Sequence, residues 1–348
     1  MRRKSNEVTI GSLRIGGNQS IAIQSMLNVR SDDIEGNIKQ AIKLKNAGCE
    51  ILRVAIPDMD SIKLISAIKE KVNIPLIADI HFDYRLAIES VAAGIDKIRI
   101  NPGNIGSEDR IKAVVKACNL KNIPIRIGVN SGSLEKDILK KYDHPTAEAL
   151  AESALYHASL LEKFDFNNIV LSMKSSNVKT MVDAYRLVSK RCAYPLHLGV
   201  TETGTVKVGS IKSAIGIGSL LCDGIGDTIR VSLTADPVEE IFCAKNILNA
   251  LNLNRTGIKF ISCPTCGRTK INLIEIAEEA AKRLEKSHKN LTVAIMGCCV
   301  NGPGEAREAD IGIAGGNGLG VIFKNGEIIK KVSEEKLLDE LIFEIEKM

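Results

Sequence analysis

The stretch ILRVAIPDMDSIKLISAIKEKVNIPLIADIHF, residues 51–82, decides the expected fold. It begins with an apolar run of strand length at 51–56 and ends with another at 76–82. Between them, SIKLISAIKEKV (61–72) has its apolar residues at the spacing of an amphipathic helix. Two near-continuous apolar strands joined by a helix predict a parallel strand–helix–strand unit, because parallel strands are buried on both faces.

Apolar runs of this kind occur eight times before residue 235, with starts about 20 to 45 residues apart. Eight strand–helix units in about 250 residues are typical of an α/β fold of the (β/α)8 TIM-barrel type. A doubly wound open sheet is the alternative. The eight runs are IAIQSM (21–26), ILRVAI (51–56), LIADIHF (76–82), KIRINPG (97–103), PIRIGVN (124–130), NIVLSM (168–173), PLHLGV (195–200) and DTIRVSL (227–233).

Polar residues lie at the C-terminal ends of these runs, where a parallel barrel carries its reactive groups. A single buried arginine would be expected to pair with a carboxylate, because an unpaired buried charge is costly. Several cations at equivalent positions instead indicate a convergent anion site, and the guanidinium fork suits phosphate oxygens. A diphosphate therefore fits. The cations are Arg53, Arg99, Arg126, Lys174 and Arg230, and the polar residues near them are Asp79, His81, Asn101, Asn130, Glu202 and Ser232.

The composition excludes other classes of function. The net charge of +5 is modest, aromatic residues make up 3%, and no Trp is present, so stacking platforms for nucleic acid are not indicated. A barrel mouth is also a pocket rather than a track for a polymer. No apolar stretch approaches the length of a membrane span, and the basic start, MRRKSNEVTIGSLRIGG, has no apolar core of signal-peptide length. We therefore expect a cytoplasmic protein that binds neither nucleic acid nor membranes.

The cysteines indicate a metal or redox centre near the C-terminus. Five of the nine are single and widely spaced, as expected of small core residues. The other four form two close pairs, Cys263 with Cys266 and Cys298 with Cys299. In a reducing compartment such pairs point to metal or redox chemistry rather than to structural disulfides.

The ligand set distinguishes zinc from iron–sulfur. The CPTC motif alone is ambiguous, but Cys298 follows a predicted strand (292–297) and starts a Gly/Pro-rich loop. Adjacent cysteines point in different directions, which leaves three thiolates and Glu305 as the nearest fourth ligand. A closed zinc site would need four Cys or His ligands, and no histidine lies near. Three cysteines with one exchangeable oxygen ligand suit a 4Fe-4S cluster. We expect a TIM barrel over 1–251 and a small α/β cluster domain over 252–348.

The chain resembles the 4-hydroxy-3-methylbut-2-en-1-yl diphosphate synthase family, iron–sulfur enzymes of the non-mevalonate isoprenoid pathway. The resemblance covers residues 7 to 320. Two departures are visible: TETGT (201–205) replaces a TEAG-type stretch and adds bulk beside Glu202, and Cys299 stands where Val is expected. The motifs that carry the resemblance are IAIQSM, ADIHFDYRLAI, IRINPGNIG, IRIGVNSGSLEKDI, HLGVTE, KSAIGIGSLLCDGIGDTIRVSL, ADPVEEI, CPTCGR and NGPGEARE.

The resemblance implies an oxidoreductase that reductively opens 2-C-methyl-D-erythritol 2,4-cyclodiphosphate with two electrons, delivered through a 4Fe-4S cluster from flavodoxin or ferredoxin. It implies Glu202 as the acid that helps the hydroxyl leave. The residues implied as cluster ligands are Cys263, Cys266, Cys298 and Glu305. The residues implied as the diphosphate clamp are Arg53, Arg99, Arg126, Lys174, Arg230 and Ser232, with Asp79, His81, Asn101 and Asn130 around them.

The linker between the domains predicts a head-to-tail homodimer. The helix from Asp236 to about Leu251 carries the chain roughly 21 Å away from the barrel mouth. The roughly seven linker residues at 252–258 span at most about 25 Å, too little to return past the helix layer to the mouth. Each cluster domain would therefore cap its partner's barrel, as the resemblance also implies.

The competing hypothesis for the function is a redox-silent barrel that binds a phosphorylated ligand and carries a zinc-stabilised appendage.

Overall fold

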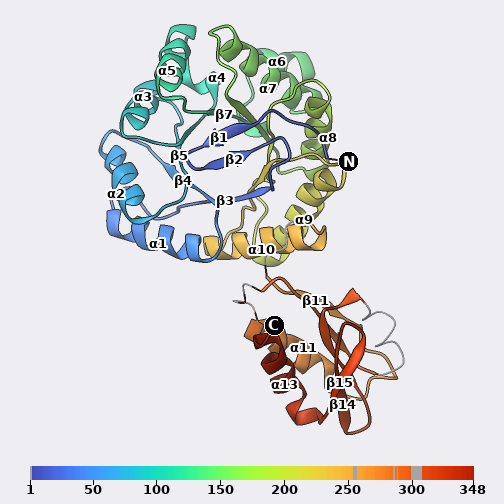
Figure 1. The fold of residues 1–348 in the computed structure, drawn as a ribbon. Coiled ribbons are helices and arrows are strands. Elements are labelled where there is room, and N and C mark those ends of the chain that lie inside the picture. Colours follow the sequence, from blue (N-terminus) through green and yellow to red (C-terminus); the bar gives the residue numbers. More distant parts are fainter. Residues whose placement is uncertain (1, 254–256, 285–286, 288, 299–307) are drawn as a thin grey trace. The chain divides into compact units, whose positions relative to one another are not determined.

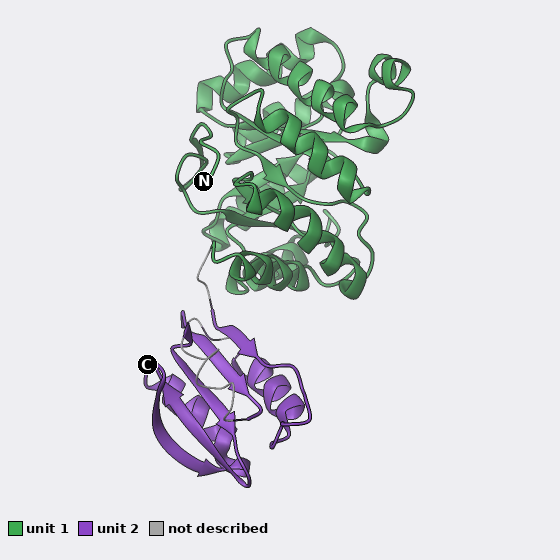
Figure 2. Ribbon diagram, turned by 90° about the vertical axis from the view of Figure 1, so that its right-hand side faces the viewer, with its two compact units in different colours: residues 1–254 green, residues 255–348 purple. Residues whose placement is uncertain are grey.

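The computed structural model describes residues 2–253, 257–284, 287, 289–298 and 308–348. It divides into two compact units, Met1–Asn254 and Arg255–Met348, which Figure 2 shows in two colours. In the described part of the chain, no helix is long and apolar enough to cross a membrane.

The first unit is a barrel of parallel strands, as predicted, and the alternative of an open doubly wound sheet is wrong. The strand order is β8-β7-β6-β5-β4-β3-β10-β9, and a bridge between Leu171 and Leu196 joins the two edges. The strands are β3 (Ala22–Met26), β4 (Ile51–Ala55), β5 (Leu76–Asp79), β6 (Lys97–Ile100), β7 (Ile125–Asn130), β8 (Ile169–Lys174), β9 (His197–Leu198) and β10 (Thr228–Ile229).

Helices form an outer ring around the strands (Figure 1). The N-cap residues Asp33, Asn177 and Asp236 accept hydrogen bonds from backbone amides of the turn that follows them. These bonds satisfy amides that have no partner within the helix. The long helices are α1 (Ile34–Asn46), α2 (Lys63–Lys71), α3 (Tyr84–Ala92), α5 (Glu108–Lys121), α7 (Ala147–Glu162), α8 (Val178–Ser189), α9 (Val206–Cys222) and α10 (Pro237–Ala250). The short ones are η1 (Asp60–Ile62), α4 (Pro102–Ile105), η2 (Ser131–Ser133) and α6 (Lys136–Tyr142).

A hairpin of β1 (Val8–Ile10) and β2 (Leu13–Ile15) closes the N-terminal end of the barrel, and Figure 1 shows it lying across the strands. Val8, Ile10 and Ile15 pack against apolar residues of the inner barrel face, including Ile51 and Ile77. The barrel therefore has an apolar floor at this end.

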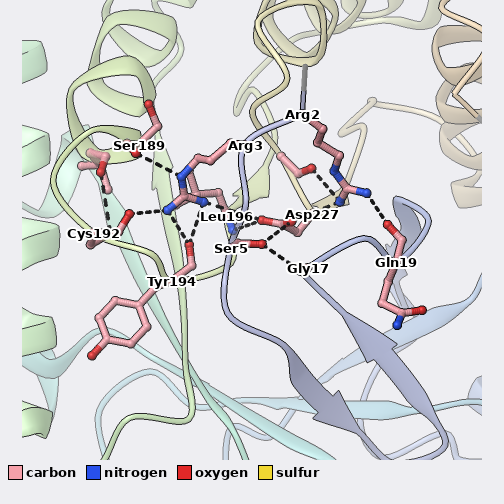
Figure 3. A network of polar contacts seen from close by, with 12 residues as sticks. Arg2, Arg3, Ser5, Gly17, Gln19, Ser189, Cys192, Tyr194, Leu196 and Asp227 are labelled. Atoms are coloured by element: carbon pink, nitrogen blue, oxygen red, sulfur yellow. Dashed lines mark hydrogen bonds and ion pairs between the residues drawn. The ribbon is translucent and has the colours of Figure 1, made fainter.

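The residues before the hairpin are also fixed to the barrel (Figure 3). The Arg3 guanidinium donates to the carbonyl of Tyr194 at 3.1 Å. The buried Asp227 carboxylate accepts from Arg2 Nη2 at 3.1 Å and from Ser5 Oγ at 2.8 Å. These contacts join the N-terminal segment to the starts of β9 and β10.

The second unit is a five-stranded sheet in the order β11-β12-β13-β14-β15, with the first three strands parallel and the last two antiparallel. Leu337, Leu341 and Ile345 of one helix pack with Ile295 and Ile313 of the sheet in a separate core. The elements are β11 (Lys259–Ser262), α11 (Leu273–Leu284), β12 (Thr292–Met296), β13 (Ile311–Gly315), β14 (Leu319–Lys324), β15 (Glu327–Ser333) and α13 (Glu334–Glu346).

Candidate functional site

Above its apolar floor, the inner face of the barrel is polar. Successive residues of a strand point to opposite faces, and Ile98, Ile100, Ile125 and Ile127 pack outward in the core that the helices cover. The residues that alternate with them face inward. This inner polar layer contains Gln24, Arg53, Asp79, Lys97, Arg99, Arg126, Ser172, Lys174, His197 and Thr228, all less than 9% exposed.

Asp79 is the shared partner of three predicted site residues. Its Oδ1 lies 3.1 Å from Nη1 of Arg99, and its Oδ2 lies 3.8 Å from Nε of Arg53 and 3.5 Å from Nε2 of His81. Burial opposes ionisation of Asp79, but Arg53 and Arg99 hold the pKa of this carboxyl below its ordinary value. Burial lowers the pKa of Arg53 to about 10, although the neighbouring Asp79 carboxylate acts in the opposite direction. Asp79 is therefore an ionised carboxylate that positions two guanidinium groups.

A second carboxylate, Glu240 of α10, pairs with Arg230. Arg230 Nη2 lies 3.3 Å from Glu240 Oε1, which also accepts from the Leu233 amide at 3.1 Å. Ser25 Oγ donates to the other Glu240 oxygen at 3.1 Å. Glu240 thus fixes the end of β10 and the guanidinium that follows it.

The remaining cations have no such partner. Within the described ranges, no carboxylate lies within ion-pair distance of Arg126, Lys174 or Lys97. Two nitrogens of Arg126, Nε and Nη1, and Nζ of Lys97 are buried without a hydrogen bond. Burial, then the neighbouring arginines, lowers the pKa of all three groups well below their ordinary values.

The balance of charge favours an anion site over a set of paired arginines. The arginines that have partners share two carboxylates, Asp79 and Glu240, while Arg126, Lys97 and Lys174 are buried basic groups without a carboxylate partner in the described part of the chain. Burial of like charges is unfavourable unless an anion joins them. The interior is thus prepared for a ligand with more than one negative charge.

Two inward-facing glycines make room for the cations. A Cβ at Gly128 would lie 2.5 Å from Nε of Arg99, and one at Gly199 would lie 3.3 Å from Nζ of Lys174 and 2.7 Å from the carbonyl oxygen of Arg230. Neither position tolerates a side chain without displacement of its neighbour. Glycine at these positions is therefore part of how the site is built.

Asn101 and Asn130 lie at the ends of β6 and β7. Buried Asn101 caps α4 by accepting from the Gly103 amide at 3.2 Å, and its Nδ2 donates to Ser133 Oγ at 3.4 Å. Asn130 is half-buried and stands opposite Lys174 in the β7–β8 register. His81, with 47% of its side chain exposed, lies nearer to solvent.

The loop after β9 carries Glu202 on a strained backbone. Glu202 is exposed and has a φ of 54°, which non-glycine residues rarely adopt. The next side chain, Thr203, is 2% exposed, and its hydroxyl donates to the carbonyl of Ser232. The extra bulk of TETGT is thus buried, and it joins the Glu202 loop to the end of β10.

The cysteines of the second unit follow neighbouring parallel strands. Cys263 follows β11, Cys298 lies two residues beyond β12, and Ser262 pairs with Ile295 between these strands. The Gly297 amide donates to Cys263 Sγ at 3.2 Å. Hydrogen bonds from Arg268, first from its backbone and then from its side chain, lower the pKa of the exposed Cys266 thiol.

The chemistry of these cysteines fits the donor set of an iron–sulfur centre. Thiolate character and backbone amide donation to sulfur both suit such a centre. Among the described side chains, no three Cys, His, Asp or Glu groups converge as closely as a bound metal ion requires. The fourth predicted ligand, Glu305, and the neighbouring Cys299 lie outside the described residues.

The sequence interpretation did not include several residues of the inner layer among the site residues. Lys97 precedes Arg99 by two residues in the same strand, so alternation alone places both on one face. Glu240 is on a helix, and no sequence signal links it with Arg230. His197 faces inward within an apolar strand, where its Nδ1 lies 2.8 Å from Thr228 Oγ1.

The sequence patterns of two domains of one protein family match the chain. The GcpE TIM-barrel domain matches residues 5–245, and the GcpE protein C-terminal domain matches residues 259–347.

Named relatives extend over the full length. The chain is 60% identical to the 4-hydroxy-3-methylbut-2-en-1-yl diphosphate synthase (flavodoxin) of Clostridium perfringens, over 99% of each chain. It is 58% identical to that of Fusobacterium nucleatum, over 98% of this chain and 96% of the relative. It is 53% identical to that of Geobacter sulfurreducens, over 100% of this chain and 99% of the relative.

Solved structures with low sequence identity share the barrel. Dihydropteroate synthase from Yersinia pestis superposes with a TM-score of 0.52 at 14% identity, covering 71% of this chain and 99% of that one. The enzyme from Stenotrophomonas maltophilia gives a TM-score of 0.53 at 13% identity, with 71% and 98% covered. At these identities the likeness concerns the fold alone.

Proposed function

The chain belongs to the GcpE family of 4-hydroxy-3-methylbut-2-en-1-yl diphosphate synthases, and we propose how its own residues perform the reaction of that family. The enzyme is an oxidoreductase of isoprenoid precursor synthesis. It converts 2-C-methyl-D-erythritol 2,4-cyclodiphosphate to 4-hydroxy-3-methylbut-2-enyl diphosphate by reductive ring opening and loss of water.

The observation that carries the assignment of the substrate site is the uncompensated positive charge inside the barrel. Arg126 and Lys174 lie buried or nearly so, without a carboxylate partner in the described part of the chain. A cyclic diphosphate supplies two negative charges in a compact ring, and each phosphate can accept from two or more donors. Substrate binding therefore relieves the repulsion that the free protein carries.

The clamp and its surroundings have separate roles in this proposal. Arg53, Arg99, Arg126, Lys174, Arg230 and Ser232 bind the two phosphates, and Asp79 and Glu240 orient the arginines that they pair with. His81, Asn101 and Asn130 bind the remaining oxygens of the substrate at the strand ends. Because these contacts are made to the charged end of the molecule, they anchor the reacting carbons at the mouth.

The clamp also stabilises the negative charge that develops on the substrate during the reaction. When the bond between the ring carbon and its phosphate oxygen breaks, that oxygen leaves with a new negative charge. The nearby cations stabilise this charge in a site of low dielectric, where such interactions are strong. The carbon skeleton receives two electrons, and its hydroxyl departs as water after it gains a proton. Glu202, at the mouth, is the proposed proton donor.

The electrons require a cofactor, because side chains cannot supply them. We propose that Cys263, Cys266, Cys298 and Glu305 hold a 4Fe-4S cluster. When bound, such a cluster supplies single electrons and an iron that can exchange an oxygen ligand. The support within this chain is the lowered thiol pKa of Cys266, the Gly297 amide that donates to Cys263 Sγ, and the position of Cys298 just beyond β12, the parallel neighbour of β11.

The partners are proposed on the same basis. The names of the relatives specify flavodoxin as the electron donor, and we propose flavodoxin rather than ferredoxin for this chain. We also propose a head-to-tail homodimer, supported by the short linker after α10. Reduced cysteine thiolates need a reducing compartment, so we propose a cytoplasmic location.

Anaerobic turnover tests the proposed function. Protein purified without oxygen should convert the cyclic diphosphate to the open allylic diphosphate when a chemical reductant is supplied. The matched variant Cys266→Ser should bind the same substrate but give no product. Zinc instead of iron in metal analysis, with substrate binding but no turnover, would favour the redox-silent barrel with a structural metal.

A further inference from the structure

Lys97 has no role in the clamp as described, yet it lies inside the same barrel. It is the first residue of β6, two positions before Arg99, so it shares the inner face with that arginine. It is 0% exposed, and its Nζ has no hydrogen-bond partner among the residues that the structure describes. A lysine is rarely buried so completely unless it is paired.

The groups that face Lys97 make its surroundings positive. Asp79 and Glu240 are engaged by arginines, and the hairpin beneath contributes apolar Val8, Ile10 and Ile15. The charged and titratable side chains around this interior are Arg53 of β4, Asp79 of β5, Arg99 of β6, Arg126 of β7, Lys174 of β8, His197 of β9, Arg230 after β10, Tyr185 of α8 and Glu240 of α10.

This environment opposes a charge on Lys97 in the ligand-free protein. Burial first, and then Arg126 and Arg53, lowers the pKa of Lys97 well below its ordinary value. Full burial without a hydrogen-bond partner, beside other cations, therefore disfavours the charged form of this amine before a ligand binds. A diphosphate bound above it would reverse the sign of the local field.

We propose that Lys97 is a positioning residue that takes up one proton when the cyclic diphosphate fills the clamp. The inference rests on the proposed substrate. The proton passes from solvent to Nζ, and the resulting ammonium group stands behind Arg126 and helps to balance the charge of the bound phosphates. Each phosphate of the cyclic substrate has a single acidic oxygen that is ionised near neutrality, so the ligand itself does not take up this proton.

Two other groups compete for the proton, and the structure favours Lys97 over both. His197 is also fully buried, but an imidazole starts from an ordinary pKa about four units below that of a lysine, so the same field charges Lys97 first. Lys174 is 7% exposed and ends β8, so it lies nearer to the mouth than Lys97, which is 0% exposed.

The sign of the effect follows from linkage. Binding raises the pKa of Lys97, so the complex holds more protons than the free protein between the two pKa values. In that pH window affinity rises as pH falls, and uptake of one proton corresponds to about a tenfold change in Kd per pH unit. Outside the window, the contribution of Lys97 to Kd is constant.

Calorimetry of the holoenzyme measures the uptake directly. The cyclic diphosphate is titrated without reductant at pH 7.5 in HEPES and in Tris, which differ in ionisation enthalpy. The dependence of the apparent enthalpy on the buffer gives the number of protons taken up. We expect about one for the wild type and none for Lys97→Met, with Kd for Lys97→Met raised at least tenfold. His197→Asn, outside the clamp, should retain the uptake.

The possible results separate a failure of the proton-uptake proposal from a failure of the proposed substrate. Tight binding by the wild type with no proton uptake between pH 6.5 and 8.5 overturns the inference but not the proposed substrate. Uptake that persists in Lys97→Met assigns the proton to another group, and its disappearance in His197→Asn would assign it to the histidine. If the wild type does not bind the cyclic diphosphate at all, the proposed substrate is wrong. If Lys97→Met fails to fold by circular dichroism, Lys97→Gln takes its place, and the wild-type measurement alone can still refute the uptake.

Discussion

Gly128 of β7 leaves the space that the guanidinium of Arg99 occupies, since a Cβ on Gly128 would lie 2.5 Å from Arg99 Nε and 2.8 Å from Nη2. The Gly128 carbonyl also accepts from that Nη2 at 3.4 Å. The position of Arg99 in the clamp therefore depends on the absence of a side chain one strand away.

We expect Gly128→Ala to weaken binding of the cyclic diphosphate by about 10- to 100-fold, because Arg99 must move away from Asp79. Gly218→Ala on α9 is the matched control, since nothing lies within 4 Å of its added methyl group. That control should retain binding and gain up to about 1 kcal/mol of stability. Equal binding by both variants would show that Arg99 does not contact the ligand.

Arg126 and Arg99 should respond in opposite ways when each is replaced by methionine. Arg126 is buried without a carboxylate partner in the described chain, so Arg126→Met should raise the Tm of the ligand-free protein while binding weakens about 30- to 100-fold. Arg99→Met breaks the 3.1 Å pair with Asp79 and should lower the Tm. Calorimetric melting with and without substrate measures both. A lower Tm for Arg126→Met would favour a structural role for that arginine.

Thr203 offers a test of how the mouth is held together. Its hydroxyl donates to the Ser232 carbonyl, so Thr203→Val keeps the shape but loses the bond between the β9 and β10 loops. We expect kcat to fall about tenfold with little change in KM, because Glu202 is adjacent and acts on the reacting end. Thr203→Ser retains the hydroxyl and should restore most of kcat. A change confined to KM would show that the bond serves substrate binding alone.

The three cysteines of the second unit should be individually essential for iron. Cys263→Ser, Cys266→Ser and Cys298→Ser should each lose the absorbance near 400 nm and most of the iron per chain. Cys222→Ser, an exposed thiol on α9, should keep both. Cys299→Ser should also keep them, because Cys298 is the proposed ligand. Loss of iron in Cys299→Ser with retention in Cys298→Ser would exchange the two assignments.

Complementation tests the proposed dimer. Arg126→Ala and Cys266→Ser chains are each expected to be inactive, one through its barrel and the other through its cluster. After subunit exchange at equal amounts, half of the dimers are mixed, and one of the two sites in each has both parts intact. Activity should approach about a quarter of wild type per total chain. No recovery, despite exchange shown by differential labelling, would mean that each barrel works with its own cluster domain.

The barrel was predictable because eight apolar runs and the helices between them repeat a single physical pattern. The gathering of arginines inside the barrel was predictable because a charge within an apolar strand is costly unless it has a partner or a ligand. Lys97 was missed because it stands at the first position of its run and resembles a strand boundary. Gly128 and Glu240 were missed because their importance arises from contacts outside their own elements, namely with Arg99 of β6 and with Arg230 after β10. The small hairpin at the barrel floor was also missed, since its strands have three residues each.

The fixed N-terminal segment has a practical consequence for protein production. Arg2 and Arg3 donate to backbone carbonyls and to Asp227 at the barrel floor, so a purification tag fused ahead of them would begin inside a hydrogen-bonded network. A tag after Met348 would begin at a residue that is 41% exposed and beyond the last helix. C-terminal fusion should therefore give the higher yield of folded barrel, and cleavage sites near Arg2 should be cut slowly by trypsin.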